Sequence, residues 1–255
     1  MHISDLPQAS WTVGVEPRCF ALVPCAGVGQ RAGVGGPKQY HPIAGQAMVA
    51  HTLAALAAVP RLAATLVVLS PEDDLFENAV PDFGGERAWV ARCGGATRAE
   101  TVANGLLELQ ARGVQPHDWV LVHDAARCLI QPTWVDRLID ACQDDDIGGL
   151  LAMPLADTLK QADGEGEADG TSPRVASTLD RRLKWAAQTP QMFRWGLLRP
   201  ALMHAGDAVT DESSAIESLG HAPRLVRGDA FNFKVTWPED FALAERLLRP
   251  SSMRR

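Results

Sequence analysis

The residues best placed to do chemistry are two cations, Arg31 and Lys38, that accompany a loop containing Gly27 and Gly29. The two segments that hold them are Pro24-Cys25-Ala26-Gly27-Val28-Gly29-Gln30-Arg31 and Pro37-Lys38-Gln39-Tyr40. Glycines let backbone N–H groups approach an oxygen-rich ligand closely. Two positive charges beside such a loop predict a site for a nucleoside triphosphate.

Two better-known phosphate loops do not fit this spacing. Residues 27–32 match the dinucleotide pattern G-x-G-x-x-A, but that pattern opens a helix and is followed by an acid about 20 residues later. Here a second glycine run and Pro37 follow, and the next acid after a strand-like run is Glu72. A P-loop needs Gly-Lys-Ser/Thr, whereas Lys38 lies between Pro37 and Gln39. A nicotinamide-dependent reductase is therefore an alternative that the missing acid and the broken helix disfavour.

Strand-like runs alternate with helical patterns along most of the chain. The predicted strands span residues 20–24, 65–70, 88–92, 119–123 and 149–153. This alternation predicts an α/β fold with a Rossmann-like, mostly parallel sheet flanked by helices. Thr97-Arg98-Ala99-Glu100 predicts a helix that starts with a capping box, and Pro238 predicts the start of a last helix.

The regular alternation of predicted strands and helices ends after Met153. Residues 158–161 and 175–179 are predicted to form two strands of a hairpin arm, about residues 156–187, with a Gly- and acid-rich tip at 162–173. A lone two-stranded ribbon cannot bury both faces, so we expect the arm to pack on another surface, such as a second subunit. Residues 18–250, with the arm included, are predicted to form a single domain, preceded by a loose tail at 1–17.

Composition excludes several classes of protein. The 255 residues carry a formal net charge of −7, which argues against a nucleic-acid surface because such surfaces cluster Lys and Arg. Five scattered cysteines without a C-x-x-C pair predict reduced thiols, no disulfide framework and a cytoplasmic location. Polar residues interrupt the apolar stretch at 47–69, which is therefore predicted to be a helix and a strand and not a membrane span. The first 17 residues lack the pattern of a secretory signal.

Polar residues follow four of the predicted strands. They are the Gly/Arg/Lys loop, Gly94–Arg98, Asp124–Arg127 and Asp157–Lys160. Ligands of open α/β sheets bind at the carboxyl ends of the strands, so we expect one crevice to collect these segments.

Several motifs together give the chain a specific resemblance. In addition to the two segments above, they are Leu121-Val122-His123-Asp124-Ala125-Ala126-Arg127, Thr189-Pro190-Gln191, Thr210-Asp211-Glu212 and Asn232-Phe233-Lys234-Val235-Thr236. Over about residues 19–248 the chain resembles the cytidylyltransferases that act on 2-C-methyl-D-erythritol 4-phosphate in the non-mevalonate isoprenoid pathway. Thr101 stands where this family usually has Ser, and Cys25 stands for a common Ala and is interpreted as a packed thiol.

The resemblance implies that CTP and the methylerythritol phosphate give the CDP-alcohol and pyrophosphate. It implies catalytic roles for Arg31, Lys38, Arg181 and Lys234. It places the nucleotide against Pro24, Cys25, Ala26, Gly27, Gly29, Gly95, Thr101, Asp124 and Ala125. It places the sugar phosphate against Asp124, Arg127, Thr158, Arg181, Thr189 and Lys234. It also implies Mg²⁺ bound mainly through the CTP phosphates, with no metal-ligating residue of the chain assigned.

The chemistry of the residues agrees with this reaction. A phosphate monoester has a second pKa of about 6 and is mostly dianionic at neutral pH, so no general base is needed. The site must supply positioning and positive charge. The resemblance also implies a homodimer in which the arm reaches into the neighbouring subunit. Two further alternatives stay open: a ribitol-5-phosphate cytidylyltransferase, and a non-catalytic nucleotide-binding regulator.

Overall fold

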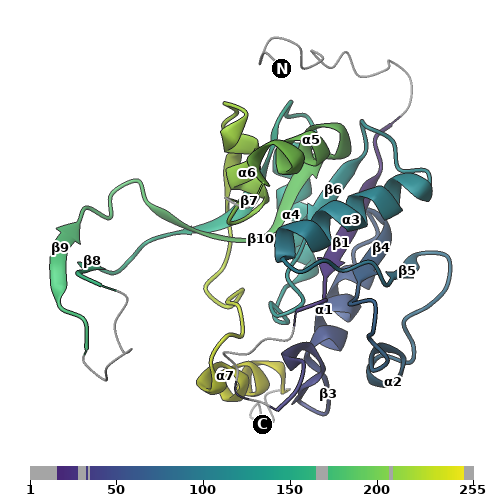
Figure 1. Ribbon diagram of the computed structural model, residues 1–255, viewed down its shortest axis with the longest axis horizontal. Coiled ribbons are helices and arrows are strands. Elements are labelled where there is room, and N and C mark those ends of the chain that lie inside the picture. Colours follow the sequence, from purple (N-terminus) through teal and green to yellow (C-terminus); the bar gives the residue numbers. More distant parts are fainter. Residues whose placement is uncertain (1–15, 28–32, 34, 165–171, 207–208, 250–255) are drawn as a thin grey trace, which may run out of the picture.

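The computed structural model describes residues 16–27, 33, 35–164, 172–206 and 209–249. A seven-stranded sheet lies at its centre, in the order β11-β7-β10-β6-β1-β4-β5 (Figure 1). Its strands are β1 (Cys19–Pro24), β4 (Leu62–Val68), β5 (Ala88–Ala91), β6 (Trp119–Val122), β7 (Gly148–Pro154), β10 (Trp185–Arg194) and β11 (Arg224–Arg227). All neighbouring pairs are parallel except those of β10, which runs antiparallel to β6 and β7. The predicted α/β fold with a mostly parallel sheet is confirmed.

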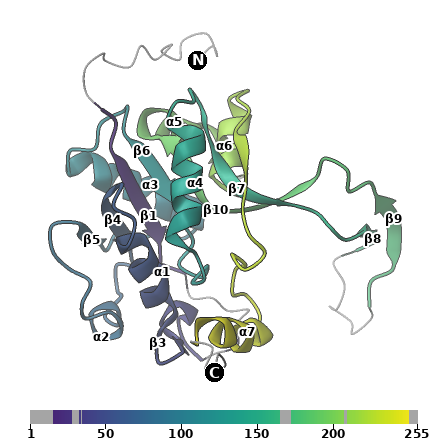
Figure 2. The same cartoon turned by 180° about the vertical axis from the view of Figure 1, so that it is seen from behind.

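Helices cover both faces of the sheet, which explains why β1 reads as a continuous apolar run. Cys19, Ala21 and Val23 pack in one core cluster, and Phe20 and Leu22 pack in another on the opposite face. The first face is covered by α1 (Met48–Ala57) and α4 (Pro132–Cys142). The second face is covered by α3 (Arg98–Ala111), α5 (Trp195–Ala205) and α6 (Glu212–Ser218), which lie beyond the sheet in the view of Figure 2. A short α2 (Phe76–Ala79) adds Phe76 to the first cluster.

Two helix starts carry the local signals that the sequence predicted. The capping box at Thr97 is present, with the Glu100 N–H donating to the Thr97 hydroxyl. The last helix, α7 (Pro238–Leu248), begins with proline as predicted. The prediction for the second strand was displaced toward the carboxyl end by two to three residues, because the apolar run continues beyond the last paired residue, Val68.

Strand β10 was not predicted, although it is the longest strand of the sheet among the described residues. Pro190 lies in its middle, and a proline normally argues against a central strand. Here the register of β10 with β7 shifts between Ala187 and Gln191, so pairing lapses around Pro190 and resumes after it. The irregularity accommodates Pro190 within a central strand.

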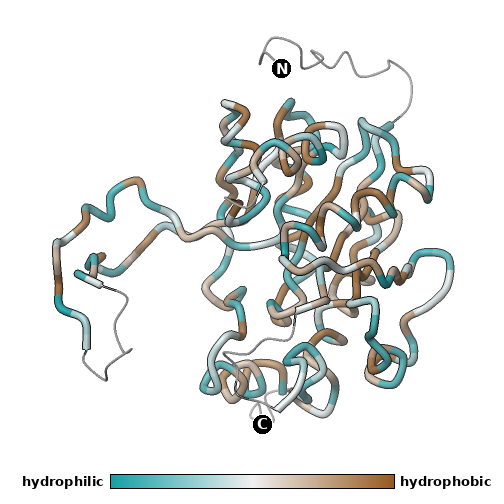
Figure 3. Tube along the Cα trace, in the orientation of Figure 1, coloured by the Kyte–Doolittle hydropathy of each residue, from teal (hydrophilic) through white to brown (hydrophobic). Residues whose placement is uncertain are grey.

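The arm is a separate antiparallel ribbon of β8 (Leu159–Ala162) and β9 (Val175–Leu179). It leaves the body after β7 and returns through β10, as Figure 1 shows. Its tip at 165–171 lies outside the described residues. Val175, Leu179 and Leu183 are 62%, 40% and 96% exposed. Figure 3 shows hydrophobic segments on the arm that no helical layer covers.

A third, smaller hydrophobic cluster lies apart from the two that cover the faces of the sheet. It joins β2 (Pro42–Ile43), which pairs with β3 (Gln46–Ala47), to α7, and Ile43, Val235 and Phe241 are among its members. This packing places Val235 beside the chain segment that carries Lys38. In the part of the chain that the structure describes, no helix has both the length and the apolar character needed to cross a bilayer.

Candidate active site

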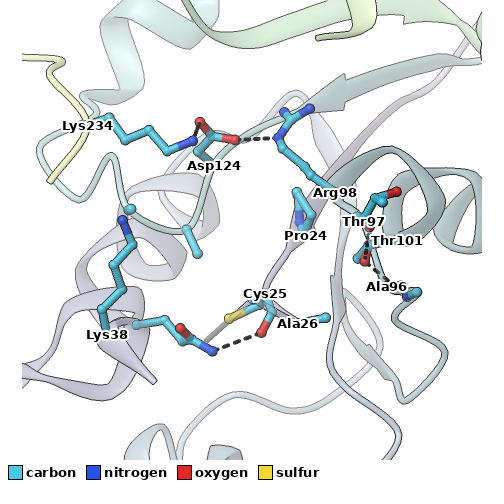
Figure 4. Close-up of a pocket in the computed structure, with 15 residues that line it drawn as sticks. Pro24, Cys25, Ala26, Lys38, Ala96, Thr97, Arg98, Thr101, Asp124 and Lys234 are labelled. Atoms are coloured by element: carbon cyan, nitrogen blue, oxygen red, sulfur yellow. Dashed lines mark hydrogen bonds and ion pairs between the residues drawn. The ribbon is translucent and has the colours of Figure 1, made fainter. Parts of the chain in front are cut away.

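A cavity of about 390 Å³ opens at the carboxyl ends of β1, β5 and β6. Its walls are the loop after β1, the short 3-10 helix η3 (Lys38–Tyr40), the loop leading into α3, and the loop after β6 (Figure 4). Ten of the predicted site residues line it together: Pro24, Cys25, Ala26, Gly27, Lys38, Gly95, Thr101, Asp124, Ala125 and Lys234. Folding therefore gathers residues spread over about two hundred positions of sequence into one cavity.

Several predicted site residues do not line this cavity or lie outside the described residues. Gly29 and Arg31 lie outside the described residues. Thr158 and Arg181 are exposed on the arm and do not line the cavity of their own chain. The expectation that one crevice collects all four polar segments is therefore wrong for the segment at 157–160. The reason is that the chain leaves the sheet after β7 and carries that segment outward on the arm.

The wall formed by the loop before α3 is closely packed and well hydrogen-bonded. The Thr101 hydroxyl accepts from the Gly95 N–H at 3.1 Å and donates to the Thr97 carbonyl at 2.9 Å. A Cβ atom added to Gly94 would overlap the Ala26 side chain and the Leu69 carbonyl. Glycine is thus required at 94 so that this loop can lie directly against the loop after β1.

The segment that carries Lys38 is hydrogen-bonded to the loop after β1. Gln39 donates through Nε2 to the Cys25 carbonyl at 3.1 Å, and Tyr40 donates through its hydroxyl to Asp73 Oδ2 at 2.6 Å. Lys38 Nζ donates to the Val235 carbonyl at 2.7 Å, which holds the ammonium at the cavity. The Cys25 thiol is buried, and burial raises its pKa, so it remains protonated at neutral pH.

Asp124 is the centre of the charged wall. It is 7% exposed, and its carboxylate lies 2.9 Å from Lys234 Nζ, 2.9 Å from Arg98 Nε and 3.8 Å from Arg127 Nε. Burial by itself raises the pKa of Asp124, but Arg98, Lys234 and Arg127 outweigh burial and hold that pKa well below its usual range. The carboxylate is therefore ionised, and it keeps the three cations close together.

The wall carries an excess of positive charge. Among the described residues around Asp124, the cations Arg98, Arg127 and Lys234 outnumber the carboxylates of Asp124 and Glu212. Lys38 adds a further positive charge to the same cavity. Such a site suits a ligand with several anionic oxygens, because fixed cations facing a partly desolvated cavity stabilise negative charge.

Arg127 and Thr189 lie behind Asp124. Arg127 donates through Nη1 to the Asn232 carbonyl at 2.6 Å, while its buried Nε has no hydrogen-bond partner. The Thr189 hydroxyl accepts from the Asp124 N–H at 3.0 Å and lies 3.1 Å from His123 Nδ1. Thr189 is buried, so in this structure its hydroxyl supports Asp124 from behind.

Two charged residues of the site received no role from the sequence, although both belong to quoted motifs. Arg98 Nη1 donates to Glu212 Oε1 at 2.7 Å across 114 positions of sequence. The one available signal was the position of Arg98 in a loop after a predicted strand. Glu212 received no role because an acid in the first turn of a helix is explained by the helix dipole alone.

Known proteins are similar to this chain over most of its length. The family model described as IspD, 2-C-methyl-D-erythritol 4-phosphate cytidylyltransferase, matches residues 19–250. A bifunctional enzyme IspD/IspF of Albidiferax ferrireducens is 58% identical over 97% of this chain and 56% of its own length. The chain therefore spans about half of that relative.

Two further comparisons cover nearly the whole of the matched protein. A 2-C-methyl-D-erythritol 4-phosphate cytidylyltransferase of Burkholderia cenocepacia is 52% identical over 93% of this chain and 99% of its own length. A crystal structure of 4-diphosphocytidyl-2C-methyl-D-erythritol synthase is similar with a TM-score of 0.78 and 39% identity, over 92% of this chain and 100% of that one. The chain belongs to the IspD family of 2-C-methyl-D-erythritol 4-phosphate cytidylyltransferases.

Proposed function

We propose that this protein transfers the cytidylyl group of CTP to 2-C-methyl-D-erythritol 4-phosphate and releases pyrophosphate. The observation that carries the proposal is the cavity itself. It joins a glycine-containing loop after β1, where a nucleotide can approach the backbone, to a wall with Lys38, Arg98 and Lys234. Membership of the IspD family supports the same reaction.

The residues provide charge and positioning for a direct displacement at phosphorus. An oxygen of the acceptor's phosphate forms a bond to the α-phosphorus of CTP, and the bond from that phosphorus to the bridging oxygen of the β-phosphate breaks. Pyrophosphate leaves with the electron pair of that bond. Because the acceptor's phosphate is mostly dianionic above a pKa of about 6, no side chain has to remove a proton. Lys38 and Lys234 are the groups that would stabilise the negative charge. Arg31, which follows Gly27 and Gly29 in the sequence, is proposed to do the same.

Mg²⁺ belongs to the same proposal. Among the described residues, no three or more His, Cys, Asp and Glu side chains are grouped so that they could hold a metal ion. Asp124 already faces three cations. The cavity therefore suits a Mg²⁺ ion that is bound by CTP oxygens and water and not by side chains of the protein, which is a common mode of Mg²⁺ binding. When bound, the ion would neutralise charge on the triphosphate.

A homodimer is also part of the proposal. The exposed apolar residues Val175, Leu179 and Leu183 support it, since a two-stranded ribbon is marginal in water without a packing partner. Thr158 and Arg181 lie on the same arm, so a second copy could receive them near its own cavity. A cytoplasmic location completes the proposal, and the free cysteines of the described chain support it.

The experiment is a comparison of acceptors with the purified protein, CTP and Mg²⁺. We expect pyrophosphate release and a CDP-alcohol of the correct mass with 2-C-methyl-D-erythritol 4-phosphate, and a much lower kcat/KM with ribitol 5-phosphate. Equal or better use of ribitol 5-phosphate would identify the other acceptor. NADH binding in the absence of CTP binding would favour the reductase, and CTP binding without turnover would favour the regulator.

A further inference from the structure

Arg98, the first residue of α3, bridges two carboxylates from distant parts of the chain. Its Nε donates to Asp124 Oδ1 at 2.9 Å. Its Nη1 and Nη2 donate to the two carboxylate oxygens of Glu212 at 2.7 and 3.0 Å. In Figure 4, Arg98 and Lys234 lie on opposite sides of Asp124. Three guanidinium N–H groups are thus directed at two carboxylates in a fixed, planar arrangement.

Glu212 is a rigid anchor for this bridge. Its side chain is fully buried, and it begins α6, directly after the helix cap Asp211. Gln191 of β10 holds this helix start by donating to Asp211 Oδ2 at 2.8 Å and accepting from the Ser213 N–H at 2.7 Å. The cap itself accepts from the Ser214 N–H at 2.9 Å. Glu212 is therefore placed by the sheet and by α6 and fixes the far end of Arg98.

The bridge determines how the Asp124 carboxylate is turned. Arg98 donates a hydrogen bond to Oδ1 of Asp124, and Lys234 Nζ lies 2.9 Å from Oδ2. Arg98 is also the largest of the influences that keep the pKa of Asp124 low against the effect of burial. Without Arg98, the carboxylate could rotate and Lys234 could follow it, because Lys234 is the more exposed of the two cations.

We propose that Arg98 is a positioning residue, anchored by Glu212, that sets the orientation of Asp124 and through it the place of Lys234. This inference rests on the proposed function, in which Asp124 and Lys234 contact the substrates. It gives Arg98 and Glu212 a role in turnover that acts through Asp124. A purely structural ion pair would instead contribute to folding and leave the reaction parameters of the folded enzyme unchanged.

A double-mutant cycle distinguishes the two roles. We expect Arg98→Met to lower kcat/KM for the acceptor by about 10- to 100-fold, the size expected when a binding group is misplaced. In an Asp124→Asn background, the same substitution should cost less than about threefold, because residues that act through one contact are not additive. An equal loss of kcat/KM on Arg98→Met in the wild-type and Asp124→Asn backgrounds would overturn the proposal.

A matched control and a second variant separate this effect from misfolding. Arg112, the residue that caps the carboxyl end of α3, forms a more exposed ion pair with Glu108, and Arg112→Met should leave kcat/KM unchanged. Arg98→Met alone leaves Glu212 buried without its partner, which is strongly destabilising. The double variant Arg98→Met/Glu212→Leu replaces the whole pair by apolar groups, a change that is often neutral for stability. It should unfold close to wild type and still show the activity loss, and full activity in this folded variant would refute the proposal.

A readout independent of turnover keeps the inference separate from the proposed function. Wild-type turnover of CTP with the acceptor tests the function. The carboxyl carbon of Asp124, followed by NMR of ¹³C-labelled protein during an acid titration, tests the bridge. Its pKa should rise by at least about one unit in Arg98→Met/Glu212→Leu, since a neighbouring cation shifts a carboxyl by this much or more. An unchanged Asp124 pKa would show that Arg98 does not govern this carboxylate, whether or not the enzyme turns over.

Discussion

Acidification should destabilise the folded protein through His123, which lies directly behind the charged wall of the cavity. Its ring is fully buried, and Nε2 lies 3.3 Å from the Arg127 carbonyl while Nδ1 lies 3.1 Å from the Thr189 hydroxyl. A carbonyl can only accept, so Nε2 carries the proton and Nδ1 accepts from Thr189. Burial lowers the pKa of His123 from 6.5 to about 4, with Asp124 opposing and Arg127 assisting the change.

The sign and size of the effect follow from proton linkage. Between the two pKa values the unfolded chain binds a proton at this ring and the folded chain does not, so stability falls as the pH falls. The contribution is fully present above the unfolded value of 6.5 and is lost progressively down to about 4. At about pH 5 the expected loss is about 2 kcal/mol, and it approaches about 3 kcal/mol near the folded pKa.

The assay is urea unfolding of wild type and His123→Gln at a series of pH values between about 7.5 and 4.5. The glutamine keeps a hydrogen-bonding side chain without a titrating group, so the difference between the two curves isolates this ring from every other titrating group. Wild type should lose about 2 kcal/mol more than the variant between about pH 7.5 and pH 5. Parallel curves would show that the pKa of His123 is not lowered in the folded state and would refute the argument that burial keeps this ring neutral.

Three further results are expected at the cavity and the arm. Lys38→Ala should lower turnover by at least about 100-fold, as removing a preorganised electrostatic donor does, and a near-normal rate would place the reaction centre elsewhere. Arg181→Ala should chiefly raise the KM for the sugar phosphate, with the neighbouring Arg182→Ala as control; a change confined to the KM for CTP would contradict this. Gly94→Ala should raise the KM for CTP by about tenfold, because its Cβ displaces Ala26. Gly84→Ala, where a Cβ meets nothing within 4 Å, should leave that KM unchanged.

Local signals predicted a large part of the fold correctly. The capping box at Thr97, the proline at the start of α7 and the two strands of the arm depend on residues a few positions apart, and each is present. The errors lie where distant partners override local preference. Strand β10 contains Pro190 yet pairs with both β6 and β7, and no property of that segment by itself indicates two antiparallel partners.

The predicted site shows the same division. Ten predicted residues line one cavity because the carboxyl ends of parallel strands meet at one edge of the sheet. The resemblance placed Thr189 and Arg127 at the sugar phosphate, which stays a prediction; neither residue lines the cavity, and the Thr189 hydroxyl accepts from the Asp124 N–H. The residues of 157–160 were expected in the same crevice, and the arm carries them away from it.

The sequence by itself therefore determined the fold class, the family and the place of the arm along the chain. These features depend on hydrophobic periodicity, capping residues and motifs of contiguous residues. Only the tertiary structure decided that Arg98 joins Glu212 to Asp124 and that His123 is enclosed as a neutral ring. Those facts depend on contacts between segments as much as 114 positions apart, and burial and charge pairing act on side chains only once the sheet has brought them together.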